Sequence, residues 1–302
     1  GKIKEESNWK NGKLNGIRKW YFPNGKLEIE DNFKDGKNHG LYEEWYDDGS
    51  LYSKYSYEDG KEHGLITYYF DNGEIKINYS SNNGLINGPY IQYYDNGNKQ
   101  IECNYKDDEI EGIYEEWHRN GQLYYKCNYI FGSEEGENEI WYESGEKYAN
   151  LQFKQGELNG ECKYWHRNGQ LMVLSNNSNN LINGLYKEWY DNGQLFIKSS
   201  YKDDIENGEY NEWYSNGNLA YQTNYNYGII DGYEKTWYEN GNPKSECYLS
   251  NGTLDGIYKS WDKNGQLREQ KEYTKGKPSG THKYWKKDGQ EVQADEWIPS
   301  SE

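Results

Sequence analysis

The heptapeptide WHRNGQL occurs twice, at residues 117–123 and 165–171, and each copy places a histidine beside an arginine. Such a pair could take part in acid–base chemistry if a nucleophile and a matching acid stood nearby. No Ser or Cys with a matching acid has a distinctive spacing in this sequence. We therefore predict that His118-Arg119 and His166-Arg167 are not catalytic and that the protein is not an enzyme.

The two copies belong to a periodicity of 24 residues. Steps of 24 from Gly121 always reach a glycine, and a second series, from Gly16 to Gly280, is equally unbroken. A third series begins at Gly12 and is interrupted only by Asp or Asn, the residues that best tolerate positive φ, so it predicts a left-handed backbone position. The first series is predicted to form structural turns: Gly25, Gly49, Gly73, Gly97, Gly121, Gly145, Gly169, Gly193, Gly217, Gly241, Gly265 and Gly289.

β-prone segments flank each glycine of the first series. Leu41–Tyr46 (LYEEWY) precedes one, and Leu195–Tyr201 (LFIKSSY) follows another. Asn or Asp stands before most of these glycines, and Asn-Gly between such segments is a strong hairpin signal. Each repeat is therefore predicted to be one hairpin followed by a polar link, such as residues 34–40. Two series of rings, beginning at Tyr21 and Trp9, would form ladders when the repeats stack.

The composition excludes several classes of protein. Aromatic residues make up 17% of the chain, with 34 Tyr and 12 Trp, which is not typical of a disordered chain. The net charge of −17 disfavours nucleic acid and makes an anionic membrane surface an unfavourable partner. No apolar run approaches the roughly 20 residues that cross a bilayer. Because the chain opens at Gly1 rather than Met, whether a segment precedes it is left open.

The cysteines and acidic links offer no metal or cofactor site. Four cysteines are too few for a disulfide framework, and none has zinc-ligand spacing. In a hairpin array Cys103 and Cys127 would lie about 9.6 Å apart, beyond the reach of a disulfide. We expect free, partly buried thiols, which slightly favours a reducing cytosol. Asx-rich links such as Lys106–Glu111 lack EF-hand spacing and are interpreted as solvated turns.

The repeat resembles a known family. Gly184–Leu195 (GLYKEWYDNGQL), followed by Tyr201, is similar to the MORN repeat variant, and the resemblance covers essentially the whole chain. It implies a repeat fold without shared catalytic residues. Arrays of this variant occur in antitoxin-like or immunity-like bacterial proteins and in giant viruses, and MORN arrays in general resemble scaffolds that bind proteins, some of them linked to membranes.

Together these observations predict an all-β fold, an elongated antiparallel β-meander of twelve 24-residue hairpin repeats. A single array would occupy residues 1–302, with an incomplete first repeat at 1–15, twelve tandem repeats at 16–290 and a C-terminal cap at 291–302. Within that cap, Glu291–Trp297 is expected to be the closing edge strand. Residues 1–30 and 259–287 are net basic, whereas 31–258 are net acidic. Because like-charged ends discourage end-to-end pairing, we expect a monomer.

The register of the hairpins decides which side chains share a face. A two-residue turn at Asn192-Gly193 would pair Tyr190 with Leu195, whereas a three-residue turn would pair Trp189 with Leu195. The three-residue form is favoured, because it groups Trp189, Leu195 and Tyr201 on one face, predicted to be the packed one. The opposite face would carry the candidate partner surface, which consists of Tyr114, Glu116, Tyr186, Glu188, Tyr190, Tyr210 and Glu212.

The sequence thus favours a non-enzymatic scaffold for protein–protein interaction that presents an acidic, Tyr- and Trp-rich curved β-surface to a protein partner of basic character. Substitutions of Glu188 and Tyr190 should then weaken binding, and Trp189→Ala should destabilise the fold. An immunity or antitoxin protein that neutralises a cognate toxin is one alternative. A membrane-surface scaffold is the other.

Overall fold

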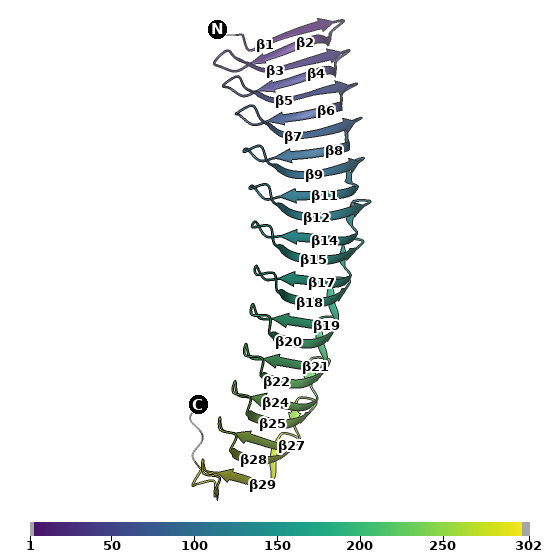
Figure 1. Ribbon diagram of the computed structural model, residues 1–302. Coiled ribbons are helices and arrows are strands. Elements are labelled where there is room, and N and C mark those ends of the chain that lie inside the picture. The colour runs from purple at the N-terminus through teal and green to yellow at the C-terminus, as the bar shows by residue number, and fades with distance from the viewer. Residues whose placement is uncertain (1–2, 298–302) are drawn as a thin grey trace. The chain divides into compact units, whose positions relative to one another are not determined.

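The computed structural model describes residues 3–297, and within that range it contains only strands and turns (Figure 1). The predicted all-β antiparallel meander is confirmed. Contacts between residues divide the chain into two compact units. The first runs up to Lys147 and adds Phe153–Gly156, and the second consists of Tyr148–Gln152 and the residues from Glu157 onward. Among the described residues there is no helix that could cross a membrane.

The strands of the first unit pair antiparallel in chain order (Figure 1). They are β1 (Glu5–Lys10), β2 (Lys13–Tyr21), β3 (Leu27–Lys34), β4 (Lys37–Trp45), β5 (Leu51–Glu58), β6 (Lys61–Tyr69), β7 (Ile75–Asn82), β8 (Leu85–Tyr93), β9 (Lys99–Lys106), β10 (Glu109–Ile110), β11 (Gly112–Trp117), β12 (Leu123–Ile130), β13 (Ser133–Glu134) and β14 (Gly136–Trp141). The next strand, β15 (Lys147–Lys154), has residues in both units.

The second unit repeats the same pattern of antiparallel neighbours. Its strands are β16 (Glu157–Leu158), β17 (Gly160–Trp165), β18 (Leu171–Ser178), β19 (Leu181–Trp189), β20 (Leu195–Lys202), β21 (Ile205–Trp213), β22 (Leu219–Asn226), β23 (Ile229–Ile230), β24 (Gly232–Trp237), β25 (Pro243–Ser250), β26 (Thr253–Leu254), β27 (Gly256–Trp261), β28 (Leu267–Thr274), β29 (Lys277–Trp285) and β30 (Glu291–Val292).

The turns that hold the first glycine series contain three residues, as the sequence favours. Between β19 and β20, the Tyr190 N–H donates to the Gln194 carbonyl at 2.9 Å, and the Gly193 N–H donates to the Tyr190 carbonyl at 2.9 Å. Gly193 has φ +83°, and Trp189 pairs with Leu195. The same two hydrogen bonds recur in all twelve turns of this series. This geometry is a type I turn closed by a left-handed glycine.

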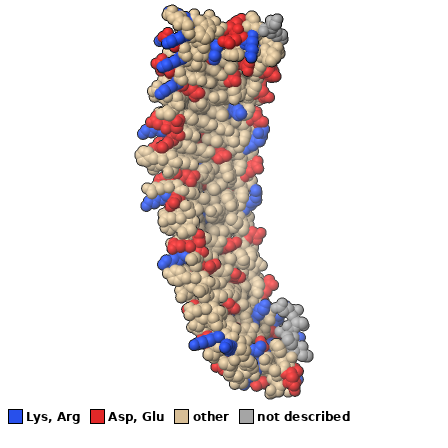
Figure 2. Space-filling view, turned by 180° about the vertical axis from the view of Figure 1, so that it is seen from behind, with Lys and Arg blue, Asp and Glu red and all other residues tan. Residues whose placement is uncertain are grey.

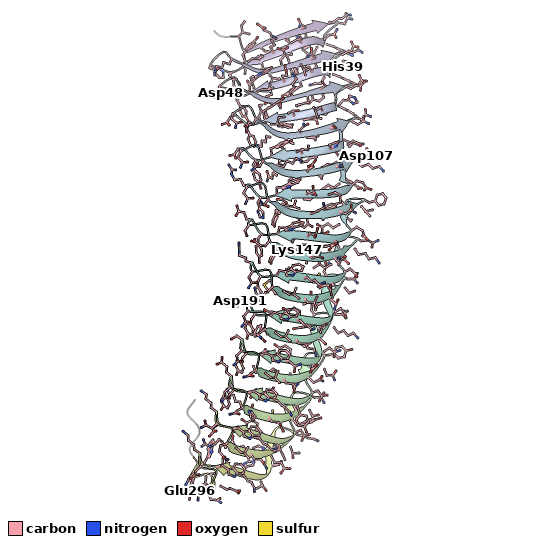
Figure 3. The ribbon with its side chains drawn as sticks, in the orientation of Figure 1. His39, Asp48, Asp107, Lys147, Asp191 and Glu296 are labelled. Carbon is pink, nitrogen blue, oxygen red and sulfur yellow. The ribbon has the colours of Figure 1, made fainter. Side chains whose placement is uncertain are left out.

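The links between repeats are hairpin turns as well, which corrects the prediction of one hairpin per repeat. Between β20 and β21, Asp203 and Asp204 have φ of 51° and 64°, and Lys202 pairs with Ile205 across them. Two residues with positive φ make a type I′ turn, so the left-handed position predicted for the third series is confirmed. Within the first unit, Figure 3 shows Asp48 of a three-residue turn and Asp107 of a two-residue turn at opposite edges of the sheet.

A β-bulge after most of the three-residue turns changes which residues share a face. Trp189 pairs with Leu195, but Glu188 pairs with Ile197, so Phe196 is an extra residue in β20. The alternation of side chains shifts by one position at such a bulge. As a result Tyr201 lies beside Tyr186, with ring centroids 5.8 Å apart. The prediction that Tyr201 shares a face with Trp189 is therefore wrong.

We call the face that carries Tyr186, Glu188, Ser199 and Tyr201, with their equivalents at 24-residue spacing, the tyrosine face. The opposite face, which carries Trp189 and its equivalents, is the tryptophan face. The prediction that the tryptophan face is the packed one is also wrong. Trp189 is only half-buried, whereas the most buried side chains lie across the middle of the tyrosine face.

Several of the residues that pair across strands on the tyrosine face complement one another in size. Ile66, which is 0% exposed, pairs with Tyr79, and Ser199, which is 1% exposed, pairs with Tyr186. Arg18 pairs with Asp31 and donates two hydrogen bonds to its carboxylate, at 3.1 and 2.6 Å. A small residue opposite a large one fills the space above the sheet. Residue types can therefore vary at these positions while the packing is kept.

The second glycine series lies opposite the second series of rings. Gly208 pairs with Tyr225 and Gly184 pairs with Tyr201 across adjacent strands. Gly208 has φ +117°, and a Cβ there would lie 3.4 Å from the Cβ of Ser200. An aromatic ring opposite a glycine covers the backbone that the glycine leaves bare. These glycines lie at a second irregularity, where the register of β20 against β21 shifts between Ser199 and Tyr201, and they leave room for the facing ring.

The C-terminal segment differs from the predicted closing strand. Only Glu291–Val292 forms a strand, β30, which pairs with β29, and the Glu296 N–H then donates to the Gln293 carbonyl in a turn. The turn brings Trp297 against Tyr284, with ring centroids 5.1 Å apart. Ring packing thus replaces further strand pairing at this end. Residues 298–302 of the predicted cap lie outside the described residues.

Candidate binding surface and pocket

The histidines of the two WHRNGQL copies have a structural role. His118 Nε2 lies 3.1 Å from the Trp141 carbonyl oxygen, and His166 Nε2 lies 3.0 Å from that of Trp189, in each case in the following repeat. In the equivalent position, the Tyr190 hydroxyl donates to the Trp213 carbonyl at 2.9 Å. Since a carbonyl oxygen only accepts, the histidine nitrogen must carry the proton. Each histidine therefore replaces a tyrosine as the donor that joins consecutive repeats.

Replacing His166 tests this role. His166→Phe removes the donor to the Trp189 carbonyl and should destabilise the fold by about 1 kcal/mol, whereas His166→Tyr restores the donor found in other repeats. Thermal unfolding followed by circular dichroism would compare the two variants. Equal melting temperatures for His166→Phe and His166→Tyr would show that the hydrogen bond contributes nothing.

The cysteines are buried thiols. All four are free, as predicted, but they are fully rather than partly buried. Cys103, Cys127 and Cys247 occupy the position of Ser199 on the tyrosine face, and Cys162 occupies that of Tyr186. Burial raises the pKa of Cys103, Cys127 and Cys247 to about 11. Thiols that stay protonated at neutral pH are poor nucleophiles. We therefore interpret the four cysteines as packing residues of the tyrosine face.

The thiols should react slowly in the folded protein. At pH 8 the raised pKa and the burial of Cys103 and Cys127 leave little accessible thiolate. Iodoacetamide labelling read by intact mass should be at least about tenfold slower in buffer than in denaturant. Rapid labelling of the native protein would contradict the burial of this layer.

Six of the seven residues predicted as a partner surface form tyrosine–glutamate pairs on the tyrosine face. The Tyr186 hydroxyl donates to Glu188 Oε2 at 3.1 Å, and Tyr210 donates to Glu212 Oε1 at 2.5 Å. The corresponding distance from Tyr114 to Glu116 is 3.5 Å. Burial raises the pKa of Tyr186, Tyr210 and Tyr114, so each phenol remains a neutral donor to its carboxylate. The glutamates are half-buried and keep part of their surface in solvent.

The seventh predicted residue, Tyr190, lies at the edge of this face beside the three-residue turn. Its ring centroid lies 4.8 Å from that of Phe196, and its hydroxyl donates to the Trp213 carbonyl. Substitution of Tyr190 would therefore remove contacts within the fold as well as surface. It is less suited than Glu188 to a test of binding alone.

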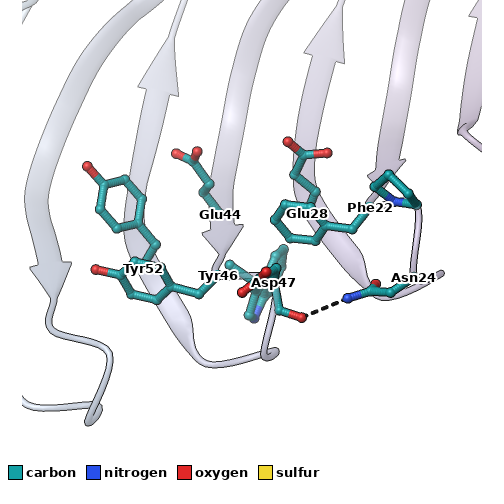
Figure 4. Close-up of a pocket in the computed structure, with 9 residues that line it drawn as sticks. Phe22, Asn24, Glu28, Glu44, Tyr46, Asp47 and Tyr52 are labelled. Atoms are coloured by element: carbon teal, nitrogen blue, oxygen red, sulfur yellow. Dashed lines mark hydrogen bonds between the residues drawn. The ribbon is translucent and has the colours of Figure 1, made fainter.

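A pocket that the sequence did not predict lies in the first unit, along the turns at Gly25 and Gly49 (Figure 4). Its cavity volume is about 700 Å³. The described residues that line it include three carboxylates and no lysine or arginine, and they are Phe22, Pro23, Asn24, Glu28, Glu44, Trp45, Tyr46, Asp47 and Tyr52. The Asn24 amide donates to the Asp47 carbonyl at 2.9 Å and joins the two turns.

Charged side chains are unevenly distributed over the surface. On the face seen in Figure 2, lysine, arginine, aspartate and glutamate gather along the borders of the sheet, and uncharged residues fill most of its middle. Several opposite charges pair on the tryptophan face, as Lys126 does with Glu115 at 2.8 Å and Lys54 with Glu43 at 2.8 Å. Among the described residues, no group of His, Cys, Asp and Glu has the arrangement of a metal site.

Comparisons with known proteins bear on the fold and the family. No curated protein matches the sequence. Two solved structures that resemble the chain are TcdB2-TccC3, with 10% identity over 89% of this chain and a TM-score of 0.21, and the Photorhabdus luminescens Tc holotoxin pore, with 11% identity over 95% and a TM-score of 0.20. The chain spans only 17% and 18% of the length of those chains. A likeness this weak supports no inference.

The family model for the MORN repeat variant matches nine segments, which together cover more than half of the chain. The segments are residues 14–35, 38–59, 86–107, 110–130, 158–177, 182–203, 206–227, 230–251 and 254–275. Each begins just after a two-residue turn, and seven of the nine extend into the next one, so the matched unit is the pair of strands joined by a three-residue turn. The chain therefore belongs to the MORN repeat variant family.

Proposed function

We propose that the protein is a non-enzymatic scaffold that binds a basic protein partner through the tyrosine face. The observation that carries this proposal is the recurrence of hydrogen-bonded Tyr–Glu pairs, such as Tyr186–Glu188, at 24-residue spacing on one face. Repeat arrays present extended surfaces of this kind to their partners. The net charge of −17 and the acidic central residues suit a partner of opposite sign.

The chemistry of the pairs suits recognition. A tyrosine that is already held by a hydrogen bond loses little entropy when a partner covers it, and tyrosine is common among the residues that dominate binding energy. The carboxylates of Glu116, Glu188 and Glu212 would attract a basic partner electrostatically. This attraction raises the association rate, and added salt weakens it.

The test compares two triple variants of equal charge. Glu116→Gln, Glu188→Gln and Glu212→Gln together remove three negative charges from the tyrosine face and keep an acceptor for each tyrosine. Glu137→Gln, Glu161→Gln and Glu209→Gln remove the same charge from exposed positions on the tryptophan face. Affinity capture with mass spectrometry should recover a basic protein with the wild type and the second variant, but not with the first. Equal recovery by both variants would contradict the proposal.

The two alternatives predict different outcomes. A neutralising protein would form a 1:1 complex with a single basic toxin and abolish its activity, whereas a scaffold would leave its partner active. A membrane-surface role would make the protein float with liposomes.

A further inference from the structure

We propose that the pocket lined by Phe22, Tyr46 and Tyr52 binds an arginine side chain of the protein partner. This inference rests on the proposed function and names the group that the partner would insert. The pocket lies wholly within the first unit, so it depends only on contacts inside that unit.

The walls combine rings with carboxylates. Figure 4 shows Glu28 and Glu44 pointing in the same direction from neighbouring strands, with the rings of Phe22, Tyr46 and Tyr52 around them. The rings of Tyr46 and Tyr52 pack edge-to-face, with centroids 5.1 Å apart. Glu44 accepts only long hydrogen bonds, from Tyr42 at 3.3 Å and from Ser53 at 3.5 Å. Carboxylates beside ring faces favour a cation over any other ligand.

Two other repeats hold a cation of their own at the place that corresponds to this pocket. The Lys76 ammonium lies 5.7 Å from the centre of the Phe70 ring, and the Lys244 ammonium lies 5.7 Å from that of Tyr238. Both lysines stand six residues after the ring that they cover. Six residues after Phe22 stands Glu28, and six residues after Tyr46 stands Tyr52. The pocket therefore has a carboxylate or a phenol where these two repeats have an ammonium.

Another repeat holds a second cation against its ring. The Arg119 guanidinium lies 5.9 Å from the centre of the Tyr94 ring and forms an ion pair with Asp95. Arg119 stands 25 residues after that ring, and Asp47 stands 25 residues after Phe22. Two kinds of position that supply a cation in a few other repeats are thus acidic or neutral here. A cation from outside the chain would complete the arrangement.

Arginine fits better than lysine. A guanidinium is planar, stacks on aromatic faces and can donate to two carboxylates at once, whereas an ammonium is a compact and strongly hydrated charge. The pocket supplies both features, with carboxylates from β3 and β4 at Glu28 and Glu44 and rings at the turns. An arginine on a basic protein would therefore stack its guanidinium on the rings, with its N–H groups directed toward the two glutamates.

The experiment uses N-acetyl-arginine methylamide as the probe and the neutral citrulline compound of the same shape as its control. Saturation-transfer NMR and calorimetry would measure binding to the whole chain. The pocket variant is Glu28→Gln with Glu44→Gln. Its matched control is Glu161→Gln with Glu209→Gln, which changes the net charge equally at exposed positions of the tryptophan face. Circular dichroism would confirm that each variant is folded.

The wild type and the control variant should bind the arginine probe at least about tenfold more tightly than the citrulline probe, and the pocket variant should lose this preference. Equal binding of the two probes, equal loss in both variants, or no binding to the wild type would overturn the inference. Should the pocket variant unfold, Glu28→Lys places a cation beside Phe22, as Lys76 is placed beside Phe70, and should block the probe. Retained binding in that variant would also overturn the inference.

The same measurements separate the two proposals. If the arginine probe does not bind but a basic protein still binds through the glutamates of the tyrosine face, the pocket inference fails and the proposed function stands. If the probe binds in the pocket but no basic protein is captured, the pocket stands and the scaffold proposal fails.

Discussion

Gly208→Val should destabilise the fold by at least about 2 kcal/mol and lower the melting temperature by about 5 °C or more. Gly208 has φ +117°, which a β-branched residue strongly resists, and a Cβ there would lie 3.4 Å from the Cβ of Ser200. The backbone would have to shift where Gly208 pairs with Tyr225 and where the register against β20 changes. Circular dichroism during heating measures the effect.

Asp204→Gly is the control for that variant. Asp204 also has positive φ, at 64°, and its carboxylate accepts a hydrogen bond from the Ile182 N–H at 2.6 Å. Glycine would relieve a strain of about 1 kcal/mol and lose a hydrogen bond of about the same value, so the net change should be small. A melting temperature as low for Asp204→Gly as for Gly208→Val would show that backbone conformation does not distinguish the two positions.

Ile66→Ala should be the most harmful truncation of a single aliphatic side chain, with a cost of about 2–5 kcal/mol. Ile66 is 0% exposed on the tyrosine face and pairs with Tyr79. Its neighbour Leu65 points to the tryptophan face and is 58% exposed, so Leu65→Ala should change stability by no more than about 0.5 kcal/mol. Chemical denaturation of both variants measures the difference. If Leu65→Ala were the more harmful, the assignment of the packed face would be reversed.

The repeat itself could be read from the sequence because glycine at positive φ leaves a signal that few other residues replace. The two unbroken series, one containing Gly193 and the other Gly208, predicted turns and strands at 24-residue spacing. The series that contains Asp204 was ambiguous, because a link and a two-residue hairpin turn favour the same residues. Only the pairing of Lys202 with Ile205 shows that it is a hairpin.

The sequence could not predict which face is packed, because no particular residue type marks the β-bulge in these strands. Phe196, the extra residue in β20, has counterparts as different as Lys76 and Arg268. The sequence therefore gave no reason to shift the alternation between Leu195 and Tyr201. The pocket was missed for a related reason, since Glu28 became informative only when its neighbours on adjacent strands were known.

The most direct test of the account is a titration of the captured partner against the whole protein at about 50 mM and about 500 mM NaCl. We expect Kd to rise at least about tenfold between these conditions. The variant with Glu116, Glu188 and Glu212 changed to glutamine should bind weakly at both, while the variant with Glu137, Glu161 and Glu209 changed should bind like the wild type. Equal affinity of the two triple variants, or an affinity that salt does not alter, would contradict recognition through the tyrosine face.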